Sequence, residues 1–312
     1  MILDKESLPI STNPKLLEMH MKVFLAILTF LSLIDGWAQQ TTLEQANELI
    51  GLNEFAEAEE LLKSALNTGN DDQLRNVLGE VYGYQAKWDK AIDIYQSLTK
   101  NNPKNAEYQF RYGGVLARKA QSTSKIKALM LVGKMKGAFL KAAELDSKHL
   151  NTRWALVDMY ISLPGLLGGS TSKAYRYAKE LKSLSHIDGY LALGYVYEYD
   201  AEPEKAKNSY LKAMEYVDEL GKVDRNQLHY QIGKVSGDYQ LRIEKGIYHM
   251  EQYIENYSVL DGVPLQWAYY RMSKLYRHSG DKKNALKWIN KALTLQPEFE
   301  QAKEEKKKVL VL

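Results

Sequence analysis

The side chains that could bind a metal ion or act as acids and bases are scattered along this sequence. Neighbouring acidic residues such as Glu59-Glu60 and Glu304-Glu305 are typical of solvated helix faces. No two histidines stand at the spacing with which one helix presents two metal ligands, and the motif HExxH is absent. We therefore predict no metal, no cofactor and no catalytic residue. The six histidines are His20, His149, His186, His229, His249 and His278.

Motifs for nucleophilic catalysis and phosphate binding are also missing. The chain contains no cysteine, which excludes thiol catalysis, disulfides and Cys-ligated zinc. Residues 163–173 read LPGLLGGSTSK, and a glycine-rich loop before a helix can cradle phosphate. This loop lacks the Gly-Lys-Ser/Thr order of a P-loop, and a helical pattern rather than a strand precedes it. We interpret it as an elaborated turn capped by Ser170 or Ser172, with a phosphate site as the minor alternative.

Composition and charge fit a folded chain that does not bind nucleic acid. The 312 residues are 45% hydrophobic and 26% charged, and the formal net charge is only +3. Polyanion-binding proteins usually concentrate far more Lys and Arg. The scarcity of proline, seven residues, favours a helical chain, because interior prolines break helices. An RNA-binding helical repeat remains an alternative that a continuous basic groove would favour.

Residues 21–38 have the layout of a secretory signal. Lys22 precedes twelve uncharged residues, VFLAILTFLSLI, and Gly36-Trp37-Ala38 places small residues where signal peptidase reads. The run is too short to cross a bilayer as a helix, which needs about twenty residues. Residues 1–20 contain acidic residues, which is unusual for the start of a signal peptide. We interpret them as an upstream extension or the result of a mis-assigned start codon, with translation beginning at Met19 or Met21. An uncleaved anchor and a buried core helix are the alternatives.

We predict export with cleavage after Ala38. The positive residue, the apolar run and the small residues occur in the order that the export machinery recognises. N-terminal sequencing of the secreted form should therefore begin at Gln39. A cytoplasmic product that keeps residues 23–34 would contradict this prediction.

An arrangement of small and aromatic residues recurs in the remaining chain. In three segments a tyrosine lies nine residues before an alanine, and in two of them a proline follows that alanine after twelve residues. Small residues let antiparallel helices approach, and the larger ones fill the space between them at helical spacing. The segments are Leu78-Gly79-x-x-Tyr82 with Ala91-x-x-x-Tyr95 and Pro103, Leu193-Gly194-x-x-Tyr197 with Ala206-x-x-x-Tyr210, and Met272-Ser273-x-x-Tyr276 with Ala285-x-x-x-Ile289 and Pro297.

These segments resemble tetratricopeptide repeats. Weaker versions of the pattern occupy residues 41–70, 106–148, 150–184 and 226–257. The resemblance implies an all-α fold, a right-handed α-solenoid of about seven antiparallel helix pairs over residues 39–312, with a polar capping helix at 298–312. Turn residues such as Asp89, Gly280 and Asp281 are expected to cap or break the helices. The long pair followed by the glycine-rich loop is similar to exported bacterial tetratricopeptide proteins without an assigned activity.

One segment departs from the plain repeat. Residues 125–138 read KIKALMLVGKMKGA, with apolar residues between lysines. We interpret it as an extension of the second helix of its pair, and a helix lying on a membrane surface is the alternative.

The resemblance also implies where a partner would bind. In such solenoids the first helix of each pair lines a concave groove, and aromatic side chains there provide contact area with few rotors to immobilise. Packing between repeats is the competing role for the same side chains. The predicted groove residues are Tyr84, Phe110, Arg118, Trp154, Asp158, Tyr195, Tyr199, Tyr230, Lys234, Trp267, Tyr270 and Lys274.

We therefore expect a protein–protein interaction scaffold in the periplasm or outside the cell. Its partner would be a protein or peptide, an extended segment or a helix, held in the groove chiefly by aromatic contacts. We expect no nucleic acid, no small-molecule substrate and no transmembrane span in the mature chain. The alternative is an enzyme whose active site assembles from residues far apart in the sequence.

Overall fold

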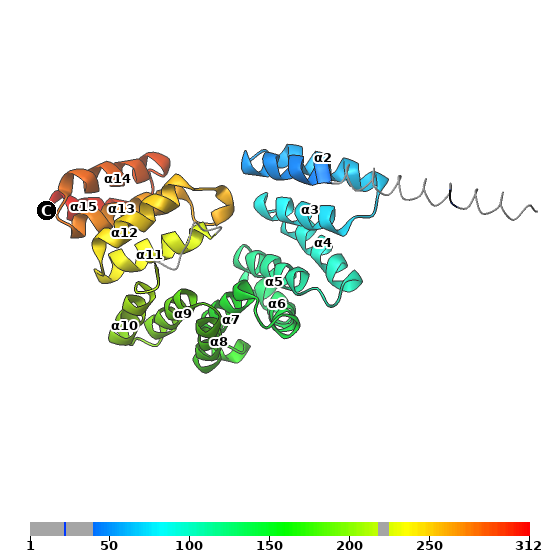
Figure 1. Ribbon diagram of the computed structural model, residues 1–312, viewed down its shortest axis with the longest axis horizontal. Coiled ribbons are helices and arrows are strands. Elements are labelled where there is room, and N and C mark those ends of the chain that lie inside the picture. Colours follow the sequence, from blue (N-terminus) through cyan, green and yellow to red (C-terminus); the bar gives the residue numbers. More distant parts are fainter. Residues whose placement is uncertain (1–21, 23–39, 218–224) are drawn as a thin grey trace, which may run out of the picture. The chain divides into compact units, whose positions relative to one another are not determined.

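The structure is a computed structural model that describes residues 22, 40–217 and 225–312. Within these ranges the chain forms helices joined by turns and no β-strand (Figure 1). The chain divides between Val81 and Tyr82, inside α3 (Asp72–Tyr84), into two compact units. The predicted signal peptide lies outside the described residues apart from Lys22. No described helix is both long enough and apolar enough to pass through a bilayer.

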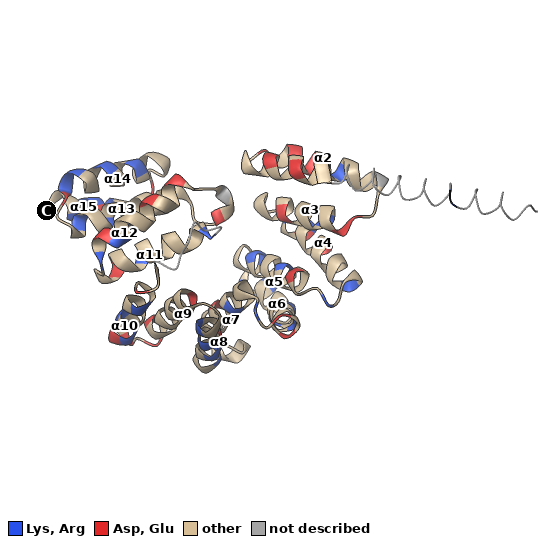
Figure 2. Cartoon of the chain, viewed as in Figure 1, with Lys and Arg blue, Asp and Glu red and all other residues tan. Residues whose placement is uncertain are grey.

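The first unit contains a helix over residues 40–51, then α2 (Phe55–Thr68) and most of α3. Ala58 and Leu62 lie four residues apart on one face of α2 and are fully buried. Ala46 of the preceding helix is buried as well. Two helices joined by a short turn therefore stand where the sequence predicts the first pair. The charged residues of α2 are mainly acidic, as the red segments in Figure 2 show.

The second unit consists of successive antiparallel pairs. We call α5, α7, α9, α11 and α13 the first helices, and each packs against the helix that follows it. First helices also contact one another, as in α5 with α7, α7 with α9, and α11 with α13. This confirms the predicted all-α solenoid of helix pairs. Its helices are α4 (Trp88–Asn101), α5 (Ala106–Gln121), α6 (Lys125–Leu145), α7 (Leu150–Ser162), α8 (Thr171–Leu184), α9 (His186–Tyr199), α10 (Pro203–Ala213), α11 (Asn226–Tyr239), α12 (Ile243–Glu255), α13 (Leu265–His278), α14 (Lys282–Leu295) and the final α15 (Glu300–Leu310), with short 3-10 turns at Gly165–Leu167 and Val259–Asp261.

Glycines and other small residues bring the helices of a pair together. A Cβ atom at Gly233 on α11 would lie 2.5 Å from Cε of Met250 on α12, and one at Gly194 on α9 would overlap the ring of Tyr210 on α10. Ala91 on α4 is fully buried. The predicted packing of small residues against larger ones is therefore confirmed at these positions.

The turns within several pairs contain a residue in the left-handed backbone conformation. At Ala201 and at Gly280 the chain enters the left-handed region, with φ of 56° and 82°. The next N–H then reaches back into the last helical turn, as Asp281 N does to the carbonyl oxygen of Tyr276 at 2.9 Å. Asp281 also accepts a hydrogen bond from Asn284 N and caps α14, as predicted. The prediction for Asp89 is wrong, because it lies inside the first turn of α4 and caps nothing.

Both departures from the plain repeat are resolved. Residues 125–138 belong to α6, a single 21-residue helix, so this segment lengthens the second helix of its pair. The loop at 163–169 is a turn that ends at Ser170, whose side chain accepts a hydrogen bond from Lys173 N and caps α8. Ser170 N donates to the carbonyl oxygen of Tyr160 at 2.8 Å, which fastens the loop to α7.

Candidate peptide-binding groove

A cleft of about 720 Å³ opens on the first helices of the second unit. Its walls come from α5, α7, α9 and α11, together with Tyr210 of α10 and Arg225 just before α11. Residues four apart on a helix share a face, so Trp154 and Asp158 line the cleft from α7. It brings together half of the predicted groove residues, namely Phe110, Arg118, Trp154, Asp158, Tyr195 and Lys234.

Trp154 has a structural and a surface role at once. Its indole Nε1–H donates to Oδ1 of Asp188 at 2.7 Å, and its ring packs against the core clusters on both sides of α9. The side chain is nevertheless only partly buried and forms part of the cleft wall. Packing between repeats and exposure to the cleft, posed as alternatives by the sequence, both apply to this residue.

Asp188 is a fully buried carboxylate beneath the cleft. Arg225 binds it with two hydrogen bonds of 2.6 and 2.7 Å, and the Ser185 hydroxyl donates to Oδ2 at 2.6 Å. Burial alone would raise the pKa of Asp188. The hydrogen bonds and charge of Arg225, with the bonds from Ser185 and Trp154, outweigh burial and hold this pKa below its ordinary value.

Apart from Trp154, no residue of this network is among the predicted groove residues. The sequence does contain a signal for the contact between Ser185 and Asp188. Ser185-x-x-Asp188 is a helix-capping pattern, and Ser185 caps α9 in the structure. Arg225 carries no comparable signal, since it lies 37 residues away in the chain from the carboxylate it binds. Asn151 and Gln231, two further polar residues of the cleft, were also missed because nothing in the repeat pattern singles them out.

Tyr195 and Asp158 form a second polar contact in the cleft. The Tyr195 hydroxyl donates to Oδ1 of Asp158 at 3.1 Å. Burial, followed by the charge of Asp158, raises the pKa of Tyr195 to about 12. The phenol is therefore neutral at physiological pH and presents a ring and a hydroxyl to a ligand rather than a base.

Cationic groups stand at the rim. Lys234 lies in the cleft, 3.9 Å from Oδ2 of Asp238. Asp238 also pairs with Arg271 and Lys274 of α13, so one carboxylate faces three cations. Arg118, on α5, adds an exposed guanidinium to the lining. The rim therefore has an excess of positive charge.

Tyr230 requires a correction. It was predicted to line the groove, but its side chain is 5% exposed and packs against Tyr253 with ring centroids 5.2 Å apart. The register of α11 turns this position toward α12 and α13, and burial raises the pKa of its hydroxyl. Tyr230 is a core residue.

The remaining predicted residues lie elsewhere than the cleft. Trp267 and Tyr270 pack edge-on against Phe299, which precedes α15, so they join the last pair to its cap. Tyr84 and Tyr199 end α3 and α9, where they are exposed and do not line the cleft. Lys274 is held by Asp238.

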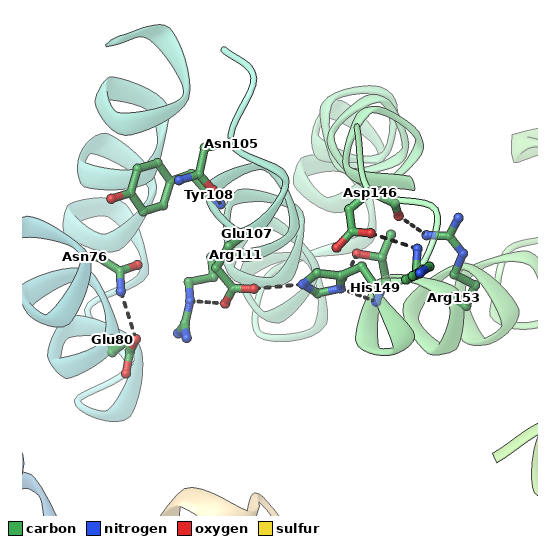
Figure 3. A network of polar contacts seen from close by, with 11 residues as sticks. Asn76, Glu80, Asn105, Glu107, Tyr108, Arg111, Asp146, His149 and Arg153 are labelled. Atoms are coloured by element: carbon green, nitrogen blue, oxygen red, sulfur yellow. Dashed lines mark hydrogen bonds and ion pairs between the residues drawn. The ribbon is translucent and has the colours of Figure 1, made fainter. Parts of the chain in front are cut away.

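Phe110 lies at the α5 side of the cleft and contacts His149, which belongs to the polar network drawn in Figure 3. Its ring centroid lies 5.1 Å from that of His149. Nδ1 of His149 accepts from Thr152 N and caps α7, so the ring proton is on Nε2, which donates to Oε2 of Glu107 at 2.8 Å. This bond lowers the pKa of Glu107 despite its partial burial. The bond between Glu107 and His149 therefore links α5 to the N-terminal cap of α7.

Among the described residues, no group of three or more His, Asp or Glu side chains is placed to hold a metal ion. The titratable groups around the cleft are instead paired with each other. His229 and His249 contact each other through Nδ1 atoms 2.8 Å apart, between α11 and α12 and away from the cleft lining.

Comparisons with known proteins agree with this architecture. Profiles described as tetratricopeptide repeat match residues 76–123, 187–216 and 268–299. A tetratricopeptide repeat protein from Parabacteroides merdae matches with a TM-score of 0.51 and 14% identity, over 87% of this chain and 98% of that one. A chain of the APC/C hetero-tetramer Cut9–Hcn1 matches with a TM-score of 0.56 and 14% identity, over 85% of this chain and 48% of that one. These likenesses concern the fold. No curated protein matches the chain by sequence.

Proposed function

We propose that this chain of tetratricopeptide repeats serves as a protein–protein interaction scaffold, and that the cleft of its second unit holds an extended segment or a helix of a partner. We further propose that it does so in the periplasm or outside the cell. The sequence of residues 21–38 supports export.

The observation that carries the proposal is the lining of the cleft. Trp154 and Tyr195 offer aromatic surface whose orientation is already fixed by hydrogen bonds to Asp188 and Asp158. Fixed aromatic side chains lose little entropy on binding, which makes them effective anchors. The cationic Arg118 and Lys234 at the rim would set the direction of the bound segment more than its affinity.

A catalytic role has no comparable support. The cleft contains Asp158, already bonded to a neutral phenol, and Arg225, already bonded to Asp188. Neither arrangement leaves a base next to a nucleophile, which acyl or phosphoryl transfer would require. Tetratricopeptide proteins are generally scaffolds without enzymatic activity.

The experiment compares two tyrosines of the same helix. The partner is captured from an envelope extract, and its affinity is measured for the wild type, Tyr195→Ala and Tyr199→Ala. Truncating an anchor typically costs about 2 kcal/mol or more, so Tyr195→Ala should bind about thirtyfold more weakly. Tyr199 is 58% exposed and outside the cleft, so its variant should bind normally. Equal affinity of both variants would refute groove binding.

We predict that the chain does not recognise acidic chaperone tails. The proteins that do so hold a terminal carboxylate with cations at fixed first-helix positions. In six successive pairs the place of the first clamp lysine is not cationic. It is occupied by Asn76, Phe110, Trp154, Leu191, Tyr230 and Tyr270 in turn. A labelled acidic tail peptide should show no binding in the micromolar range. Micromolar, charge-dependent binding would contradict the prediction.

A further inference from the structure

A second surface of the molecule combines exposed apolar side chains with a dense set of lysines. We propose that this surface binds the face of an anionic lipid bilayer. We call it the basic apolar face, and it consists of the first half of α6, the loop at 163–169 and the lysines of α6 and α8. Its apolar members are Ile126, Leu129, Met130 and Leu166, which are 76%, 49%, 76% and 98% exposed.

The apolar side chains of α6 form one stripe that the fold does not use. Ile126, Leu129 and Met130 stand at i, i+3 and i+4, so they share one side of the helix. The opposite side packs through Met135 and Phe139, which are buried. The exposed stripe therefore makes no contribution to the core, and three large apolar residues in contact with water need another explanation.

The loop extends the same surface. Lys136 follows Leu129 by seven residues on α6, hence on the same side, and its Nζ lies over the ring of Tyr160 at 5.7 Å. Nζ of Lys173 on α8 lies 5.4 Å from the centroid of the same ring, so one lysine of α6 and one of α8 lie near Tyr160 of α7. A Cβ atom at Gly168 would lie 2.6 Å from Nζ of Lys136, which places the loop against α6. The loop thereby presents Leu166 beside the lysines.

This face carries an excess of positive charge, as does α14, which contains four lysines and no acidic residue. α6 contains five lysines and one glutamate, and α8 contains four basic residues and one acidic residue. Blue bands mark α8 in Figure 2. By contrast, α12 contains one lysine and three glutamates. Lysine side chains can rest their stems on apolar surface and still keep the ammonium groups in water.

The combination favours an anionic membrane surface as the occupant. Lysines attract anionic headgroups, and the apolar tips can enter the boundary between headgroups and acyl chains to a depth of about 5–10 Å. A helix with apolar residues on one side and lysines around them is typical of interfacial binding. A polyanion such as nucleic acid would leave Ile126, Met130 and Leu166 without an apolar environment.

The test uses vesicle co-sedimentation. The full chain and the chain beginning at Gln39 are mixed with vesicles of phosphatidylcholine alone or of phosphatidylcholine with phosphatidylglycerol. Both chains are needed because residues 23–34 could bind lipid by themselves. We expect binding to the anionic vesicles that decreases with added salt. The triple variant Ile126→Ser/Met130→Ser/Leu166→Ser should bind about tenfold more weakly or worse, because it removes the side chains that would be buried.

The matched control is Tyr248→Ser, which removes a 56% exposed aromatic residue from the acidic helix α12 and should bind as the wild type does. Circular dichroism should show equal helicity and unfolding midpoints, because all four positions are exposed. Equal binding to neutral and anionic vesicles, or unchanged binding of the triple variant, would overturn the proposal. So would reversible dimerisation that the triple variant abolishes while no vesicle binding occurs, because the occupant would then be a second copy of the chain.

Discussion

Trp154→Ala is expected to lower the free energy of unfolding by about 3–5 kcal/mol, in the range for truncation of a core aromatic residue. The ring packs against two core clusters, and its removal also takes a hydrogen-bond donor from the buried Asp188. The cleft wall is lost at the same time, so partner binding should fail even in the fraction that stays folded. Urea unfolding and partner affinity are to be measured on the same preparations.

The variant Trp154→Phe separates the contribution of the aromatic ring from that of the indole N–H group. It keeps an aromatic ring but lacks the N–H group, so it should lose about 1.5–3 kcal/mol, the usual worth of a hydrogen bond to a charged group. Partner binding by this variant should persist if the ring is the anchor. An unfolding midpoint of Trp154→Ala close to that of the wild type would show that the packing assigned to this residue is wrong.

Arg225→Ala should cost about 3 kcal/mol at neutral pH. Removing one partner of a buried ion pair leaves the other charge without compensation, and Asp188 has no exposed side-chain surface. We expect the lower end of the usual range because Arg225 itself is 34% exposed. The matched control is Arg176→Ala, whose side chain is 60% exposed next to Glu180 and should change stability by no more than about 1 kcal/mol.

The pH dependence distinguishes this ion pair from simple packing. In the wild type the pKa of Asp188 is below its ordinary value of 3.8, so its stabilising contribution is complete above that pH and is lost as the pH falls through the lower value. Without Arg225, burial dominates and the pKa of the carboxyl should be raised. The variant should then recover stability relative to the wild type as the pH is lowered from 7 to about 5.

Urea unfolding at several pH values checks this sign. The double variant Asp188→Asn/Arg225→Ala removes the buried charge altogether and should be more stable at neutral pH than Arg225→Ala alone. A stability difference between Arg225→Ala and wild type that is the same at pH 7 and pH 5 would contradict the assignment.

Local features of the sequence were sufficient to predict the helix pairs. The spacing of Gly194 and Tyr210, for example, encodes a contact between adjacent helices, and the structure makes that contact. The extension of α6 and the cap at Ser170 follow from helical periodicity and capping chemistry within a few residues. Such features depend on neighbours in the chain, which a sequence displays directly.

The floor of the cleft could not be predicted in the same way. Trp154 and Tyr230 occupy equivalent positions in their repeats. Tyr230 is nevertheless enclosed by α12 and α13, whereas Trp154 reaches the cleft. Which of two equivalent positions is covered depends on the size and tilt of the following pair. The Asp188–Arg225 pair joins residues distant in sequence, and the repeat pattern contains no information about it.

Site-specific photocrosslinking in the native host tests the central claim most directly. A photoreactive residue is placed in the cleft at Asn151 or Gln231, and on second helices at the exposed Asn208 or Asn290 as matched controls. Partner binding in the cleft predicts the same discrete crosslinked product from both cleft positions, and no such product from the controls. A product that forms from Asn208 or Asn290 but from neither cleft position would contradict the account.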